Sequence, residues 1–508
     1  MFRWKTAAAA VAVAALTLTG CAAQGPDTNS TPGGTLTLAD TLAPTTLDAA
    51  GSGWAVISPY YQAAYDTLLR ATTDGKIEPF LAQKWSYNKD KTVLTLNLRS
   101  GVTFSDGSKL TAAVVKTNLE RFQKGTSPDA SFLKGIKSID APDDLTVVLN
   151  LSAPDPAMLN YLARDSGLIA SGDAIAKDPK SLATNPIGSG PYVLDTKETV
   201  IGASYVYTKN PNYWNASVQH YDKVVIKVMA DATAAINAMK SGEVNGVRLL
   251  NNNNLEEIKG AGWTINQNEM NVFGMLLLDR GASSNKALGD VRVRQAINYA
   301  FDRKSLLKAL QFDNGTVTEQ VFPKRSAAFD AGLDTHYSFD PQKSKQLLSE
   351  AGYPNGFTLT MPSTASVGAT TWTLIGQQLG DVGIKVEFTD AASNFVSDIL
   401  APKYPAAWIG LEQQSDWQLT QFMISPTAVW NPFKYSDPKV DEFIKQIQYG
   451  DESAQQSASK QLNKYIVEQA WFAPWYRPNN SFATDAQTSV TMLPSNVFPA
   501  IYDFEPKK

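Results

Sequence analysis

Apolar and polar positions follow strand and helix periods in turn along the chain. Leu36 and Leu38 alternate with threonines, and within residues 93–99 Leu94, Leu96 and Leu98 alternate with the polar residues Thr95 and Asn97. This period of two predicts two strands, each with one buried face. Strands of this kind recur between helical patterns throughout the sequence.

The helical patterns carry their own start and stop signals. Residues 289–310 form the clearest one: Asp290 stands at the N-cap position and the apolar residues after it share one face. Asp340-Pro341 predicts the start of another helix, ending at Gly352. A third apolar stripe, at residues 372–382, runs directly into the strand 384–388. Helices that feed strands in this way indicate an α/β fold.

Residues 185–246 combine turn, strand and helix signals most densely. NPIGSGPY forces an irregular turn before an apolar run, and NPNYW makes a second turn followed by two large rings. Asp231 then precedes an Ala/Ile/Met helix that stops at Gly242. Each fragment alone indicates only local structure.

Composition excludes several classes of protein. The chain has 508 residues, which allows roughly three domains, and a formal net charge of −4 without a basic stripe, so nucleic acid is not an expected partner. Cys21 is the only cysteine, which excludes an intrachain disulfide. His220 and His336 are the only histidines, so we expect no histidine-based zinc site, no other metal site and no cofactor.

Residues 1–20 have the pattern of a lipoprotein signal peptide. A positive start and a short apolar region precede Leu18-Thr19-Gly20-Cys21, which looks like a lipobox. We therefore expect cleavage before Cys21 and lipidation of its sulfur; the alternative is an ordinary signal peptide with an incidental cysteine. Residues 21–34 are rich in small residues, Pro and Gly and should form a flexible tether. The expected location is extracytoplasmic, in the periplasm or at the outer face of the membrane, with the lipid anchor as the only membrane contact.

The order of several sequence blocks resembles one family. These blocks are YDTLLRATTDGKIEPFLAQKW, LRSGVTFSDGSKLTA, IDAPDDLTVVLNLSAP, NPIGSGPY, NPNYW, SGEVNG, GDVRVRQAINYAFDR and FDPQKSKQLLSEAGYPNGF. Together they resemble the peptide/nickel/opine-type solute-binding proteins (family 5, oligopeptide- and dipeptide-binding-like) that serve ABC importers, and the resemblance covers the whole mature chain.

The resemblance implies an α/β, two-lobed, three-part clamshell of the periplasmic-binding-protein kind (type II or cluster C). One lobe would comprise residues 35–52, 184–271 and 478–508, with a small domain, 53–183, inserted into it. Residues 272–477 would form the second lobe. Two hinge crossings, near Asn271 and Arg477, would join the lobes around the ligand.

The resemblance also implies a function without catalysis. The protein would capture an oligopeptide or dipeptide-like solute by lobe closure and deliver it to the transmembrane subunits of an ABC permease, acting as a monomer. Peptide binders of the family commonly place an aspartate three residues after the tryptophan that corresponds to Trp408. Here that position is Leu411, and the nearest acids are Glu412 and Asp416. Either could pair with a ligand ammonium, or both could be solvated loop residues.

Several aromatic residues are further candidates for ligand contact. Trp54, in a Gly/Ser loop, is equally compatible with a local plug and a ligand contact, and Asn271 and Phe273 stand at the first crossing. The remaining candidates are tryptophans of the second lobe, which crowd together with the expected core residues Trp471 and Trp475: Trp408, Trp417 and Trp430. Because aromatic rings offer apolar platforms, an oligosaccharide or another uncharged solute is the alternative ligand.

Enzyme motifs are missing from the sequence. It contains no Gly-x-Ser-x-Gly elbow, no Walker A pattern and no HExxH. A pair of carboxylates acting as a hydrolase remains a weak alternative, since 49 acids offer many pairs. We therefore expect a binding protein and not an enzyme.

Overall fold

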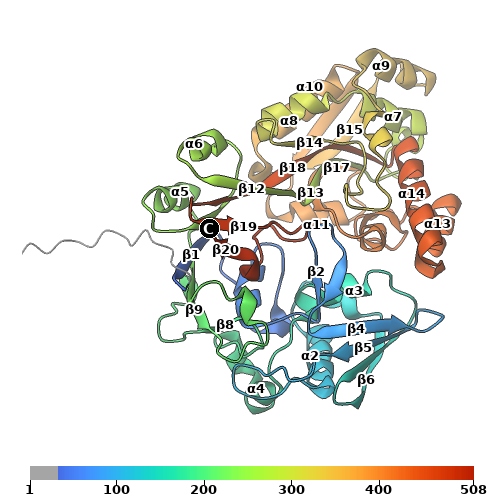
Figure 1. The fold of residues 1–508 in the computed structure, drawn as a ribbon. Coiled ribbons are helices and arrows are strands. Elements are labelled where there is room, and N and C mark those ends of the chain that lie inside the picture. Colours follow the sequence, from blue (N-terminus) through green and yellow to red (C-terminus); the bar gives the residue numbers. More distant parts are fainter. Residues whose placement is uncertain (1–32, 508) are drawn as a thin grey trace, which may run out of the picture.

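The computed structural model describes residues 33–507 and has two lobes (Figure 1). Cys21 and most of the predicted tether lie outside the described residues. No helix among the described residues is long and apolar enough to cross a membrane.

The first lobe is built on the N-terminal strand. Its strands lie in the order β11-β1-β10-β9-β8, and β1 is parallel to both of its neighbours. Leu36 and Leu38 of β1 are fully buried, as their alternation predicts. These strands are β1 (Thr35–Asp40), β8 (Tyr192–Leu194), β9 (Ser204–Lys209), β10 (Lys223–Val228) and β11 (Gly246–Leu249). The helices of this lobe are α1 (Ser58–Ala64), α5 (Ala232–Lys240) and α6 (Leu255–Gly260).

A smaller antiparallel sheet lies beside this lobe (Figure 1). Its order is β4-β5-β7-β6, and the helix α2 packs on β6 and β7. Thr111 caps α2 by accepting a hydrogen bond from the backbone N–H of Val114. The strands are β4 (Ala82–Tyr87), β5 (Val93–Leu98), β6 (Ile136–Asp143) and β7 (Thr146–Leu151), with the hairpin β2 (Leu69–Ala71) and β3 (Ile77–Pro79). The helices are α2 (Ala112–Lys124), α3 (Met158–Leu162) and α4 (Gly172–Lys177).

The second lobe contains most of the helices. The sequence predicts one helix over residues 289–310, and this prediction is wrong. Two helices, α7 (Val291–Tyr299) and α8 (Arg303–Gln311), occupy this range instead. The chain breaks between them because Asp302 caps α8 by accepting a hydrogen bond from the backbone N–H of Ser305. The helices are α7 (Val291–Tyr299), α8 (Arg303–Gln311), α9 (Pro341–Glu350), α10 (Ala369–Gly380), α11 (Phe395–Leu400), α12 (Asp416–Leu419), α13 (Pro438–Tyr449) and α14 (Glu452–Glu468). The strands are β13 (Asn271–Leu277), β14 (Gly315–Val317), β15 (Phe357–Ser363), β16 (Ile384–Asp390) and β17 (Ala406–Glu412).

Two strand segments connect the lobes. Strand β12 (Thr264–Glu269) continues after Met270 into β13, and β18 (Phe472–Thr484) runs alongside both. The first half of β18 pairs with β13 and β14, and its second half pairs with β12 and β11. The pairing therefore changes lobes beside Asn271 and Arg477, where the family resemblance places the crossings. The chain then returns to the first lobe through β19 (Thr488–Val490) and β20 (Phe504–Pro506).

The close approach of β13 and β18 generates a first prediction. A Cβ atom at Gly274 would lie 2.5 Å from the Ala473 oxygen and from the Pro474 Cα. Gly274→Ala should therefore push the two strands apart and lower the free energy of unfolding by roughly 1–3 kcal/mol. Urea unfolding measures the change. Gly260→Ala is the matched control, since a Cβ atom there, at the end of α6, would meet nothing within 4 Å, and it should be neutral or slightly stabilising. If the two variants are equally stable, the close approach of β13 and β18 does not limit the size of residue 274, and the prediction is contradicted.

Candidate functional site

A cavity of about 320 Å³ lies where the three parts of the chain meet. The β2–β3 hairpin and the end of α3 form one side, and the segments around residues 323–327 and 412–418 form the other. Pro494 and Ser495 of the C-terminal segment complete the wall. Segments separated by more than 300 residues therefore line one site.

An ion pair bridges this cavity. Arg164 Nη1 lies 2.9 Å from Glu412 Oε1, at the end of β17, and both side chains are largely buried. Burial disfavours the charged guanidinium, but the nearby carboxylates outweigh this effect and raise the Arg164 pKa. Two further contacts join the same parts: Lys91 Nζ donates to the Gly450 carbonyl at 2.8 Å, and Gln448 donates to the Pro154 carbonyl at 3.1 Å.

Two more carboxyl groups stand behind Arg164. Asp129 and Asp165 contact each other, and Ser127 Oγ donates to Asp165 at 3.3 Å. Burial raises the pKa of both groups, and the Asp129 charge raises that of Asp165 further, while Arg164 opposes the shift. Ionising both carboxyl groups is unfavourable because they are in contact and out of water, so burial and mutual repulsion favour a form of the pair that keeps one proton.

The opposite wall carries a second arginine and a second acid. Arg325 donates through Nη2 to the backbone carbonyl of Gln413, and burial lowers its pKa. Asp416, at the start of α12, accepts from the hydroxyl of Ser326, and burial raises its pKa. Within residues 33–507, Asp416 takes part in no ion pair. The cavity thus has charged groups of both signs on one wall.

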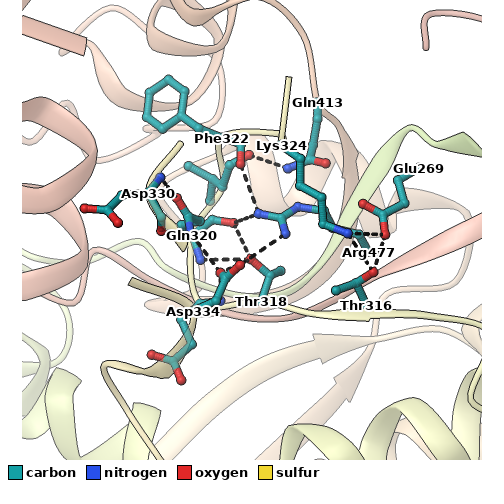
Figure 2. A network of polar contacts seen from close by, with 12 residues as sticks. Glu269, Thr316, Thr318, Gln320, Phe322, Lys324, Asp330, Asp334, Gln413 and Arg477 are labelled. Atoms are coloured by element: carbon teal, nitrogen blue, oxygen red, sulfur yellow. Dashed lines mark hydrogen bonds and ion pairs between the residues drawn. The ribbon is translucent and has the colours of Figure 1, made fainter. Parts of the chain in front are cut away.

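A buried arginine on β18 holds this wall in place. Figure 2 shows Arg477, whose Nη2 donates to the backbone carbonyls of Gln320 at 3.2 Å and Phe322 at 3.0 Å. Its Nη1 lies 3.7 Å from Asp334 Oδ2. Because Arg477 is fully buried, losing these contacts would leave a charge without compensation. The hinge strand therefore fixes the segment that leads directly into Pro323 and Arg325.

The structure places three of the predicted site residues in the cavity lining: Glu412, Asp416 and Trp417. Trp54 lies instead in the core of the first lobe, where its Nε1 donates to Asn496 at 2.9 Å. Asn271 pairs with Glu412 across β13 and β17 but is not part of the lining.

The remaining aromatic candidates are packed against other rings. Phe273 and Trp408 lie with their ring centroids 5.6 Å apart, and Trp430 lies 5.9 Å from Phe422. None of them lines the cavity. Trp471 and Trp475 are buried in the core, as expected. Ligand contact by these aromatic residues stays a prediction.

Residues of the lining that the sequence did not single out include the two arginines and several amides. Arg164 and Arg325 sit in loops without a periodic pattern, so nothing local marks them. The amides Gln413, Gln414 and Gln418 belong to the run EQQSDWQ after the buried strand β17. A mostly polar run at the end of a buried strand, broken only by Trp417, was a usable signal. Within residues 33–507, no cluster of three or more His, Cys, Asp or Glu side chains is arranged to hold a metal ion.

Comparison with known proteins assigns the fold to a family. Residues 76–440 match the model of bacterial extracellular solute-binding proteins, family 5, and the chain belongs to this family. This confirms the resemblance inferred from the sequence blocks and the two-lobed fold that it implies.

Relatives and solved structures extend the match over nearly the whole chain. The glutathione-binding protein GsiB of Shigella dysenteriae is 28% identical over 469 residues, covering 84% of this chain and 87% of GsiB. HbpA2 from Haemophilus parasuis has a TM-score of 0.83 at 22% identity, covering 93% of this chain and 100% of HbpA2. The periplasmic binding protein DppA from Helicobacter pylori, in complex with the peptide STSA, has a TM-score of 0.74 at 22% identity, covering 94% and 98%. GsiB and DppA are binding proteins by name.

The shared proton of Asp129 and Asp165 generates a second prediction. The folded pKa of Asp165 is raised above the unfolded value, so the folded state binds more protons and its stability falls as pH rises through the raised pKa. As the pH rises from 6 to 8, the wild type should therefore lose roughly 1 kcal/mol of stability per pH unit from this group. Asp165→Asn, which stays neutral, should remove most of this slope in urea unfolding, whereas the exposed Asp173→Asn should retain it. Parallel slopes for all three proteins would contradict the shared proton.

Proposed function

We propose that this protein is the substrate-binding component of an ABC import system and that it binds a short zwitterionic peptide between its lobes. The observation that carries the proposal is the interlobe cavity with Arg164 and Arg325 beside Glu412 and Asp416. A peptide with free ends offers one ammonium and at least one carboxylate, so it complements a wall with both signs of charge.

The ion pairs indicate how a peptide would be oriented. Glu412 is already paired with Arg164, whereas Asp416 accepts hydrogen bonds from neutral groups and takes part in no ion pair within the described residues. Glu452, the other lining acid without an ion pair, is exposed, so Asp416 is the more buried acid that a ligand ammonium would meet. We therefore assign the ligand ammonium to Asp416. Arg325 hydrogen-bonds only a backbone carbonyl, so its charge is available to a ligand carboxylate.

Size and relatives support a short ligand. A volume of about 320 Å³ lies at the lower end of the range for small-molecule sites. This favours a peptide of about two or three residues. The GsiB relatives are named for glutathione, itself a tripeptide, and DppA was solved with a peptide, which supports the same class. An uncharged oligosaccharide is less favoured, because Trp417 is the one tryptophan of the described chain that lines the cavity.

Capture would proceed by lobe closure. The two connecting segments at Met270 and in β18 allow one lobe to rotate against the other. A ligand shifts such an equilibrium only as far as it binds the closed form more tightly than the open form. The permease subunits would then recognise the closed lobes, and the protein would act as a monomer without catalysis of its own.

Ammonium recognition is the third prediction. Asp416→Asn should weaken binding of trialanine by roughly 2–5 kcal/mol, the range for removing a buried charge partner. It should change the binding of N-acetyl-trialanine much less, because that peptide has no ammonium. Calorimetry on both peptides measures the difference.

Glu412→Gln is the matched comparison, since Glu412 already has a cationic partner in Arg164. We expect it to weaken both peptides to a similar extent. If Asp416→Asn also fails to distinguish the free from the acetylated amine, the assignment of the ammonium to Asp416 is refuted.

Membrane attachment through Cys21 is the fourth prediction. We propose that a lipid on this residue anchors the protein outside the cytoplasm, supported by the Leu-Thr-Gly-Cys motif around the chain's only cysteine. Two acyl chains give stable attachment, whereas one gives only marginal binding. Cys21→Ala should move the protein into the soluble fraction with peptide affinity unchanged. Retention of the variant on membranes after a high-salt wash would contradict the lipid anchor.

A further inference from the structure

Gln413 is the most constrained polar residue of the cavity wall. Its backbone N–H donates to the Met270 carbonyl at 2.7 Å, at the crossing between β12 and β13. Its own carbonyl accepts from Arg325, and its side-chain Nε2 donates to the Val321 carbonyl at 2.7 Å. Figure 2 shows it beside Phe322 and Lys324, at the edge of the Arg477 network. Backbone and side chain are thus both fixed.

These contacts leave one atom of the side chain unused. Only 1% of Gln413 is exposed, and its Oε1 has no hydrogen-bond partner within the described chain. The orientation of the amide follows from chemistry, because the Val321 carbonyl requires the NH₂ group as its donor. The side chain therefore presents an acceptor, and a buried acceptor without a donor is unfavourable.

Gln413 lies on the wall between the first cavity and a larger space. A second hollow of about 400 Å³, lined by Gln267, Asn268 and Asn479 among others, lies against the hinge strands. It shares four lining residues with the first cavity: Pro323, Arg325, Gln413 and Pro494. The two prolines have no N–H, and the Arg325 guanidinium donates to the Gln413 carbonyl. Neither of the two shared prolines can therefore donate a backbone hydrogen bond to the side-chain Oε1 of Gln413.

We infer that Gln413 is a specificity-determining residue whose Oε1 accepts a hydrogen bond from a peptide N–H of the ligand, where the ligand passes between the two hollows. This inference rests on the proposed function and deepens it from charge recognition to main-chain recognition. A neutral amide oxygen suits a neutral N–H donor, whereas the ligand ammonium is matched by the carboxylate of Asp416. Since Gln413 is bonded to Met270, the same contact would tie the ligand to the first crossing.

The test uses trialanine and two analogues in which one or the other peptide N–H is replaced by an ester oxygen. For the wild type, one of the two analogues should bind about tenfold more weakly than trialanine, since it lacks the donor that Gln413 requires. Gln413→Met should bind trialanine about tenfold more weakly than the wild type and should no longer distinguish that analogue from trialanine. Gln461→Met, exposed on α14 and outside both hollows, is the matched control and should behave as the wild type.

The outcomes separate this inference from the proposed function. If the wild type binds trialanine and both analogues equally, Gln413 does not read a peptide N–H and the inference is overturned, whatever the variant does. If Gln413→Met weakens trialanine and both analogues by the same factor, its role is structural and the inference is again overturned. If the wild type binds no peptide but binds a maltooligosaccharide, the proposed function is overturned together with the inference.

Discussion

The pairing of β18 with both lobes is the constraint on which the rest of the structure depends. One strand of 13 residues provides the edge for β13 and β14 in one lobe and for β12 and β11 in the other. Its pairing with β13 has a register shift between Phe273 and Gly274, and Gly274 and Pro474 pack so closely there that only glycine fits. Arg477, on the same strand, holds residues 320–322 through their carbonyls and so sets the position of the cavity wall. Strand β18 therefore both connects the two lobes and supports the wall of the cavity.

Electrostatics in the cavity follows from burial. Arg164 stands among three carboxyl groups, those of Glu412, Asp129 and Asp165, and only one of these forms an ion pair with it at short distance. Burial raises the pKa of the remaining two, Asp129 and Asp165, and so favours a protonated form of the pair with less negative charge in a space with little water. On the other wall, Asp416 and Arg325 interact with neutral groups. Within the described residues neither of these two groups forms an ion pair, so a ligand that carries both charges would give each a close partner of opposite sign. This is the physical basis for preferring a zwitterion over a sugar.

The local sequence pattern was sufficient to predict most helices and strands, but not to predict the residues of the candidate site. Alternation placed Leu36, Leu38 and the 93–99 strand correctly, because one face of each strand is buried. The break between α7 and α8 was missed, since Phe301 continues the apolar face across the point where Asp302 starts a new helix. Trp54 was undecidable from its loop, because its partner Asn496 lies 442 residues further along the chain. Arg164 and Arg325 could not be recognised from the sequence for the same reason, since their partners are distant along the chain.

Glu412 and Asp416 were found because the family resemblance directed attention to the residues after Trp408. The adjacent Gln413 was overlooked because its role depends on contacts with Met270 and Val321.

The central claim is that the space between the lobes selects short peptides by their charged ends. Native mass spectrometry of the protein in an equimolar mixture of dipeptides, tripeptides and maltooligosaccharides tests it most directly, because all candidates compete for one site. The account predicts a one-to-one complex with a dipeptide or tripeptide, which disappears when the same peptides are supplied with acetylated amino ends. A complex with a maltooligosaccharide in preference to every peptide would contradict it.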